Sequence, residues 1–239
     1  LTGGIALGDS VIKLTQNGVI DREKFLAIYQ DREGMPEELQ DVLNAPSLNP
    51  ILLTKENANY YVNLMWPLGL ANYMSSNNES PVNTKSLFNF ASTGGWNLGK
   101  EENGGAYFNK FNIVELTPEQ EALVTKVAQN TYRPCCNNST FFQDCNHGSA
   151  LLGLLQLGAS QGLSEDELYR EALRREGRHQ APEVAEMMRR RGVGDAGPPR
   201  RRQGGHAVLR TRTAGMVQAA MGQGTGRQPV SRVHSISTT

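Results

Sequence analysis

The sequence predicts an all-α, mostly helical single domain with long loops, followed by an Arg-rich C-terminal tail. Residues 150–157, ALLGLLQL, are apolar on nearly every side, which is typical of a helix buried in a core. Capping-box sequences at Thr117 and Ser164 mark two further helix starts. Convincing strand alternation of apolar and polar residues is not evident between these helices. Helices joined by loops indicate an all-α fold.

Two short amphipathic helices are expected near the N-terminus. Residues 21–32 carry apolar side chains at helical spacing, and a second short helix begins at Met35. Pro46 and Pro50 then mark a loop. A further loop, rich in Ser and Asn, is expected at residues 75–86.

Residues 54–73 are the longest helical candidate in the first half of the chain. Thr54 fits its N-cap position. Pro67 is expected to kink or interrupt this helix, because proline lacks the backbone N–H of a helix interior. The helix that begins at Thr117 is expected to continue to Asn130 and to deliver the chain directly into a cysteine-rich segment.

That segment holds all three cysteines of the protein, Cys135, Cys136 and Cys145, together with His147, the first of four histidines. The pattern Cys-Cys-x8-Cys-x-His places three thiolates and one imidazole within 13 residues. Thiolates combined with an imidazole suit Zn(II), Cu(I) or an iron–sulfur centre. The sequence therefore predicts a metal site, with Zn or Cu(I) ahead of an iron–sulfur cluster. Its role is structural, electron transfer or metal handling.

Neighbouring residues support the predicted ligands. Asp144 is positioned to accept a hydrogen bond from the ring nitrogen of His147 that does not bind metal. Asn146 is the expected N-cap of the Leu-rich helix, and Gly162 its C-terminal stop. Cys145 and His147 then lie at the positive end of the helix dipole, which favours the thiolate form of a cysteine.

The spacing of the cysteines leaves alternatives open. Zinc modules usually separate paired cysteines by two to four residues, whereas Cys135 and Cys136 are adjacent. A disulfide between Cys136 and Cys145 would instead indicate an extracytoplasmic thiol–disulfide protein. A catalytic thiol assisted by His147 and inert buried thiols are the remaining interpretations. The sequence does not decide whether the protein is an enzyme.

A glycine-rich segment upstream resembles part of a phosphate-binding loop. Residues 94–100 match Gly-x4-Gly-Lys, but Glu101 stands where a Ser or Thr would bind Mg²⁺. Residues 87–90 also make a poor hydrophobic strand. We therefore expect a Gly-rich turn that lets Trp96 pack, and no nucleotide site.

The cysteine segment also resembles a set of bacterial and archaeal proteins, apparently exported, for which no activity is established. The resemblance is carried by CCNN at residues 135–138, DCNHG at residues 144–148 and an upstream FASTGGW at residues 90–96. It covers roughly residues 50–172. The resemblance implies that these segments belong to one folded unit and that the protein is extracytoplasmic. It also implies further aromatic-rich helix beyond Leu173, which this chain lacks.

Charge and composition change sharply along the chain. Residues 1–169 carry 10 Lys+Arg against 19 Asp+Glu, whereas residues 170–239 carry 14 Arg, no Lys and 5 acids. The second part also lacks Phe, Tyr, Trp, Asn and Cys, so it cannot bury enough apolar surface to fold. We expect it to be disordered or translated out of frame, in which case its three histidines are not ligands.

An Arg-rich arm that binds nucleic acid is the functional alternative for the tail, through Arg189–Arg191 and residues 199–202. The tail lacks the aromatic side chains on which bases stack, so nucleic acid is not an expected partner. No hydrophobic run approaches transmembrane length. The expected organisation is an N-terminal segment of residues 1–20, a helical domain of residues 21–175 with the cysteine cluster, and a tail of residues 176–239.

Overall fold

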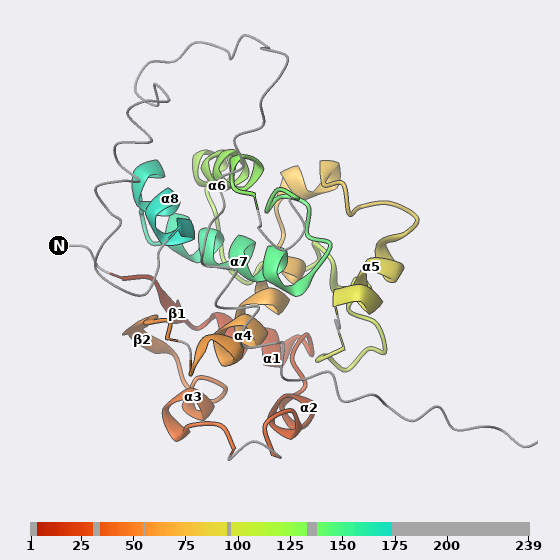
Figure 1. Ribbon diagram of the computed structural model, residues 1–239, viewed down its shortest axis with the longest axis vertical. Coiled ribbons are helices and arrows are strands. Elements are labelled where there is room, and N and C mark those ends of the chain that lie inside the picture. The colour runs from red at the N-terminus through yellow and green to blue at the C-terminus, as the bar shows by residue number, and fades with distance from the viewer. Residues whose placement is uncertain (1–3, 31–33, 55, 95–96, 133–137, 174–239) are drawn as a thin grey trace, which may run out of the picture.

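A computed structural model of the chain describes residues 4–30, 34–54, 56–94, 97–132 and 138–173. Within these ranges the protein is mostly helical, as predicted, and it also contains a two-stranded antiparallel sheet (Figure 1). The elements in chain order are β1 (Ala6–Gly8), α1 (Ser10–Gln16), α2 (Arg22–Ala27), α3 (Glu37–Asp41), β2 (Ser47–Pro50), α4 (Ala58–Ala71), the 3-10 helix η1 (Ser75–Glu79), α5 (Leu87–Gly94), the 3-10 helix η2 (Gly104–Tyr107), α6 (Pro118–Asn130), α7 (Asn146–Ser160) and α8 (Glu165–Leu173).

Helix α7 lies at the centre of the fold. Figure 1 shows it crossing the middle of the molecule, with α4 on one side and α6 and α8 on the other. Its side chains enter two hydrophobic clusters: Ala150, Leu154 and Leu157 belong to the larger one, and Leu152, Leu155 and Ala159 to the smaller one. A helix that packs into hydrophobic clusters on two of its sides must be apolar nearly all round. The prediction of a buried core helix is therefore confirmed.

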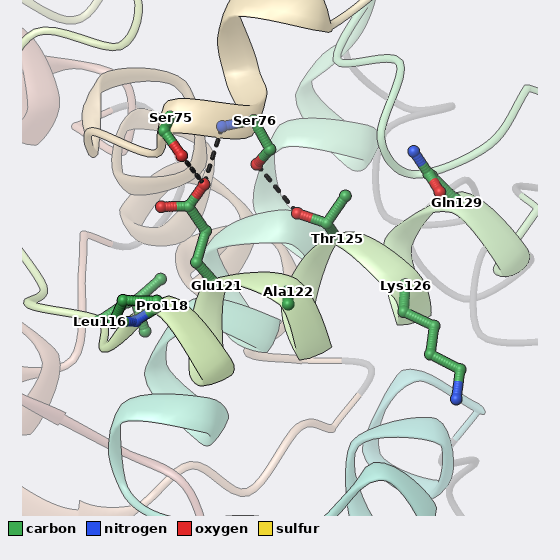
Figure 2. Close-up of a pocket in the computed structure, with 9 residues that line it drawn as sticks. All are labelled: Ser75, Ser76, Leu116, Pro118, Glu121, Ala122, Thr125, Lys126 and Gln129. Atoms are coloured by element: carbon green, nitrogen blue, oxygen red, sulfur yellow. Dashed lines mark hydrogen bonds between the residues drawn. The ribbon is translucent and has the colours of Figure 1, made fainter.

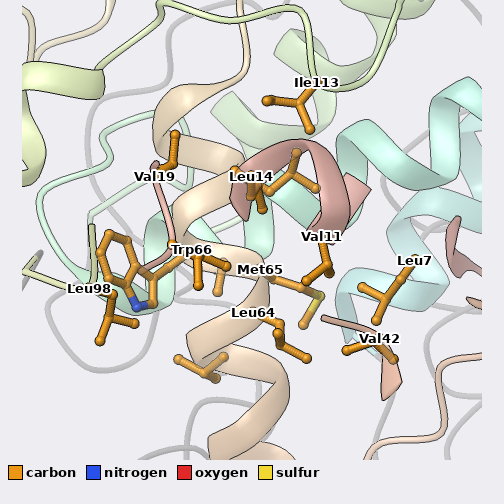
Figure 3. Close-up of a cluster of buried hydrophobic side chains, with 14 of the residues drawn as sticks. Leu7, Val11, Leu14, Val19, Val42, Leu64, Met65, Trp66, Leu98 and Ile113 are labelled. Carbon is orange, nitrogen blue, oxygen red and sulfur yellow. The ribbon is translucent and has the colours of Figure 1, made fainter. Parts of the chain in front are cut away.

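The larger cluster joins the N-terminal part of the chain to α4. Figure 3 shows Leu7, Val11 and Leu14 packed against side chains of α4, including Leu64 and Met65. All five side chains are buried. Residues near the N-terminus, expected to form a separate segment, thus contribute to the same core as the central helices.

The two helices that meet most extensively, α4 and α7, approach with glycine at the contact. A Cβ placed on Gly153 would lie 2.5 Å from the carbonyl oxygen of Met65, and one placed on Gly69 would overlap the carbonyl oxygen of Ser149. Backbone therefore packs on backbone at this crossing. Helix α4 also continues through Pro67, so this proline does not interrupt the helix, and the expected kink stays a prediction.

The sheet was not expected from the sequence. Strand β1 pairs with β2 through Ala6 and Pro50 and through Gly8 and Ser47, with an irregularity between the two pairs. Strands of three and four residues are too short to show alternation, and their pairing joins segments about 40 residues apart in the chain. Pro50, expected to mark a loop, instead ends β2, a position that an edge strand tolerates.

Helix starts follow the sequence signals in most cases. Thr117 and Gln120 form a complete capping box at α6, and the Ser164 hydroxyl and backbone N–H both donate to Glu167 at the start of α8. The N-cap of α4 is Asn57 rather than Thr54. Thr54 forms reciprocal hydrogen bonds with Asn57 one turn earlier, so the helix begins later than predicted.

None of the helices in the described part of the chain is both long enough and apolar enough to cross a membrane. This agrees with the expectation from the sequence. The Arg-rich tail, residues 174–239, lies outside the described residues, and so do the predictions made for it.

Candidate metal site at the start of helix α7

The first turn of α7 carries two of the four predicted ligands. The helix begins at Asn146, and its N-cap is Cys145, with an extended backbone at φ −149° and ψ 167°. Asn146 was expected at the cap, so the boundary differs by one residue. The Cys145 carbonyl accepts the first helical hydrogen bond, from Ser149 N at 3.1 Å. Cys145 and His147 therefore lie at the positive end of the helix dipole, as expected.

His147 and Asn146 present unusual polar atoms. Nε2 of His147 and Oδ1 of Asn146 are both buried, and neither has a hydrogen-bond partner among the residues that the structure describes. Leaving such atoms unpaired costs about 1–3 kcal/mol each. The two buried atoms at the start of α7 therefore need a hydrogen-bond partner or a metal ion that the described residues do not supply. An unprotonated imidazole nitrogen is also the commonest metal-binding atom in proteins.

The loop with the other two cysteines is closed at its base. Tyr132 and Ser139 form an isolated antiparallel bridge, and Thr140 donates both its backbone N–H and its hydroxyl to the Thr131 carbonyl, at 2.8 and 2.9 Å. Thr131 and Thr140 are buried. Cys135 and Cys136 lie outside the described residues, but the chain on either side of them is held together.

A second contact ties this loop to the helix. Oδ2 of Asp144 accepts a hydrogen bond of 2.8 Å from Nδ2 of Asn138. Asn138 lies two residues after Cys136, and Asp144 immediately precedes Cys145. The Asn138–Asp144 bond therefore holds the end of the loop beside the start of α7. The hydrogen bond predicted between Asp144 and His147 stays a prediction.

Packing beneath the loop fixes its position on the helices. The backbone N–H of Phe141 donates to the Ala128 carbonyl of α6 at 3.2 Å, and the Phe141 carbonyl accepts from the Ser80 hydroxyl at 3.1 Å. Phe141 is buried in the smaller cluster with Leu152 and Leu155 of α7. The loop base is thus part of the core rather than a surface excursion.

The described residues do not by themselves assemble a metal site. Among them, no three side chains of His, Cys, Asp and Glu form a group that could hold a metal ion. Two of the four predicted ligands, Cys135 and Cys136, lie outside that part of the chain. The geometry accordingly brings together Cys145, His147 and the base of the loop, and leaves the complete ligand set as a prediction.

The segment that resembles a phosphate-binding loop has a different structural role. A helix, α5, precedes it where a phosphate-binding loop would require a strand. The Gly99 carbonyl accepts from the Lys24 ammonium at 2.7 Å, and Lys100 N donates to the Gly18 carbonyl. A Cβ on Gly99 would lie 2.5 Å from the ring of Tyr107. Position 99 therefore needs glycine, because any side chain there would clash with the Tyr107 ring. Trp96 lies outside the described residues.

A surface groove of about 530 Å³ lies between η1 and α6 (Figure 2). Glu121 spans it, accepting hydrogen bonds from the Ser75 hydroxyl at 2.6 Å and the Ser76 backbone N–H at 2.7 Å. The Thr125 hydroxyl donates to the Ser76 hydroxyl at 2.9 Å. These hydrogen bonds hold η1 onto α6. Sequence reasoning missed this contact, because Ser75 and Glu121 are far apart in the chain.

The Glu121 contact predicts an acid-sensitive contribution to stability. Burial alone would raise the pKa of Glu121, but the hydrogen bonds from Ser75 and Ser76 outweigh it and hold the pKa below its ordinary value of 4.5. A carboxyl group with a lowered folded-state pKa stabilises the fold above its unfolded-state pKa and loses that effect as the pH falls through the folded value. The difference in unfolding free energy between wild type and Glu121→Gln is therefore expected to shrink on acidification below about pH 5. The unfolding free energies of the two proteins are measured by urea denaturation over this pH range. A difference between them that does not change with pH would contradict this assignment.

Comparison of the chain with protein-family models, with curated proteins and with solved structures gives no match. The case for a function therefore depends on the residues and contacts described above.

Proposed function

We propose that the protein binds a metal ion through Cys135, Cys136, Cys145 and His147. The observation that carries this proposal is the buried Nε2 of His147, which has no hydrogen-bond partner among the described residues and lies in the same helical turn as Cys145. A metal ion would give this nitrogen a partner. The ligand set of three thiolates and one imidazole suits Zn(II) in a closed tetrahedral site, or Cu(I).

Covalent geometry supports the contribution of the loop cysteines. An extended chain advances at most about 3.6 Å per residue, so the Cα atoms of Cys136 and Asn138 are separated by no more than about 7 Å. The side chain of Asn138 already contacts Asp144 beside Cys145. The chain is therefore short enough to bring Cys136 to the start of α7. The same argument applies to Cys135, which is one residue further from Asn138 along the chain.

The surroundings favour the protonation states that metal binding needs. The N-terminus of α7 favours a thiolate at Cys145. Asp144 and Asn146 are the polar residues next to the two ligands, and we assign them the role of orienting those ligands through hydrogen bonds. The role of the metal is structural, electron transfer or metal handling. We favour Zn or Cu(I) over an iron–sulfur cluster.

The proposal is tested by elemental analysis of the full chain, purified without oxygen and assayed for thiols before and after chelation. We expect one metal ion per chain and thiols that react only after the metal is removed. Cys145→Ser and His147→Gln are each expected to lower metal affinity by at least about tenfold, since each removes a ligand. The matched control His206→Gln changes a tail histidine to which we assign no ligand role, and should retain the metal in full.

A metal-free protein, or a Cys145→Ser variant with full metal content, would overturn the assignment. A metal-free protein with two oxidised cysteines would support the alternative, an extracytoplasmic thiol–disulfide protein with a bridge between Cys136 and Cys145. Non-reducing mass spectrometry distinguishes these outcomes, because a disulfide removes two hydrogens and blocks alkylation.

The proposed organisation follows from the same reasoning. The helical domain predicted at residues 21–175 carries the metal site, the N-terminal residues share its core, and the Arg-rich tail supplies no ligand. A nucleic-acid-binding role for the tail concerns residues outside the described part of the chain. Salt-dependent DNA binding that disappears when residues 174–239 are deleted would support that role.

A further inference from the structure

The groove between η1 and α6 combines apolar side chains with an open carboxylate oxygen. The hydrogen bonds that Glu121 accepts from Ser75 and Ser76 both go to Oε1. Figure 2 shows the second carboxylate oxygen, Oε2, turned away from Ser76 toward the Leu116 side of the groove. Three of the lining residues are apolar: Leu116, Pro118 and Ala122. Glu121 can therefore hold η1 with one oxygen and accept a hydrogen bond from a ligand with the other.

The groove lies in an acidic part of the surface. Residues 111–125 contain three glutamates, Glu115, Glu119 and Glu121, and no Lys or Arg. Glu115 and Glu119 are exposed, and none of the three forms an ion pair with a cation in the described part of the chain. Among the lining residues the one cation is Lys126, which is paired with Glu165 at 2.7 Å. The negative charge beside the groove is thus available to a cation from elsewhere.

A cationic side chain on an apolar stem fits these features. Arginine covers apolar surface with its aliphatic stem, while its guanidinium donates charge-assisted hydrogen bonds to a carboxylate. The groove has a volume of about 530 Å³, within the range of about 300–1,000 Å³ that is typical of ligand sites. It therefore suits arginine side chains better than neutral or acidic groups.

The chain itself carries the matching charge. Residues 1–169 hold 10 Lys+Arg against 19 Asp+Glu, a net charge of −9, and residues 170–239 hold 14 Arg against 5 acids, a net charge of +9. Within this tail, residues 187–191 (Met-Met-Arg-Arg-Arg) place two long apolar side chains before three adjacent cations. Residues 200–202, the other run of three arginines, follow a glycine and two prolines. Residues 187–191 therefore match both the apolar and the acidic part of the groove.

We infer that residues 187–191 of the tail bind in the groove between η1 and α6 of the same chain, with an arginine guanidinium at Oε2 of Glu121. The arginine stems and the two methionines contact the apolar lining residues. A disordered segment can order on a surface when it binds. The contact consequently needs no fold of the tail's own.

The place where the tail begins makes this contact reachable. The tail follows directly after Leu173, the last residue of α8, and α8 packs against α6. Leu173 is about 12 Å along α8 from Glu165, which binds Lys126 of α6. Lys126 in turn is about 8 Å along α6 from Glu121. The 16 residues from Leu173 to Arg189 can span about 55 Å when extended, so the tether is long enough.

The tether also makes a weak contact sufficient. A short flexible linker holds two segments of one chain at an effective concentration on the order of millimolar. Surface ion pairs are individually weak and are screened by salt. Several of them, formed within one chain, keep the groove occupied at low ionic strength and release it at high ionic strength.

Tail binding in the groove has a consequence for the nucleic-acid role considered for the tail. Arginines that bind the groove cannot bind phosphate at the same time. The domain therefore competes with nucleic acid for residues 189–191.

The inference is tested by NMR spectroscopy of the isotopically labelled full chain, in which the methyl groups of Ala122 and Thr125 report on the groove. Raising the salt concentration from about 50 mM to about 500 mM screens surface ion pairs and is expected to shift these methyl signals as the tail leaves. Combining Arg189→Gln, Arg190→Gln and Arg191→Gln is expected to give the high-salt positions already at low salt. All three substitutions lie outside the described domain, so the result does not depend on refolding a damaged core.

The matched control replaces residues 200–202, also three arginines, by glutamine and removes the same charge from another part of the tail. It is expected to leave the two methyl signals at their wild-type, low-salt positions. Equal shifts in both variants would show a general charge effect, and no shift in either variant would show an empty groove. Each of these results would overturn the inference.

Dilution distinguishes the two possible sources of the tail. Binding within one chain is expected to leave the wild-type methyl signals unchanged when the protein is diluted tenfold. Signals that move to the high-salt positions on dilution would show that a second copy supplies the tail, and would overturn binding within one chain. None of these outcomes depends on metal binding at Cys145.

Discussion

Gly69→Ala is expected to destabilise the protein by about 3 kcal/mol or more, at the upper end of what overpacking a core costs. The added methyl group would overlap the carbonyl oxygen of Ser149, with Gly153 N also within 2.8 Å. Both are backbone atoms of α7, so neither can rotate away as a side chain does. Relief requires α4 and α7 to separate, and α7 supplies both hydrophobic clusters. The gain in helix propensity, about 1 kcal/mol for Gly→Ala, is much too small to compensate.

The measurement is chemical denaturation of the full chain, followed by far-UV circular dichroism. Gly158→Ala is the matched control, since it places the same methyl group in α7 against side chains. Its nearest neighbour would be the end of Leu168, at 2.7 Å, which can shift. We expect the control to change stability by no more than about 1 kcal/mol. Equal effects of the two substitutions would show that backbone contact does not govern the α4–α7 crossing.

Asn72→Ala is expected to cost about 2–4 kcal/mol, because it leaves two buried backbone donors unpaired. Oδ1 of Asn72 accepts from Ile113 N at 2.9 Å and from Val114 N at 2.8 Å. Asn72 is 0 % exposed and ends α4. The substitution also removes the unpaired Nδ2, which offsets part of the loss. The segment entering α6 would lose two hydrogen bonds to the end of α4 and would keep the backbone bond from Phe111 N to the Ala71 carbonyl.

The change in unfolding free energy is compared with that of Asn83→Ala. Asn83 makes one exposed hydrogen bond, from its Nδ2 to the Asn78 carbonyl at 3.1 Å, so its loss should stay within about 0.5 kcal/mol. Faster amide hydrogen exchange at Ile113 and Val114 is the expected local signature of Asn72→Ala. A variant with wild-type stability would mean that the segment finds other acceptors for both donors.

Local signals in the sequence located most of the long helices. The capping box at Thr117 predicted the start of α6, because the side-chain bonds that satisfy the first N–H groups involve residues three apart. The apolar run from Ala150 predicted a buried helix for an equally local reason.

Elements that depend on distant partners were missed or misplaced. Helix α5 was not predicted, because residues 87–90 carry only weak helical signals, and the β1–β2 pair has too few residues to show a pattern. Pro67 is tolerated within α4, where tertiary packing outweighs its local cost. Helix α7 begins one residue earlier than expected, with Cys145 rather than Asn146 at its cap. For the candidate site, the sequence alone supplied the prediction of four ligands, from their residue types and their proximity in the chain.

The sequence by itself thus determined a mostly helical protein and its buried central helix, and it predicts a cysteine–histidine cluster at the start of that helix. These depend on residue type and short-range spacing, which a sequence displays directly. Only the tertiary structure decided that glycines bring α4 and α7 into backbone contact, and that a buried nitrogen of His147 has no hydrogen-bond partner within the described part of the chain. Such features arise when segments distant in the chain pack together and exclude water. Short-range sequence patterns do not show which distant segments will meet.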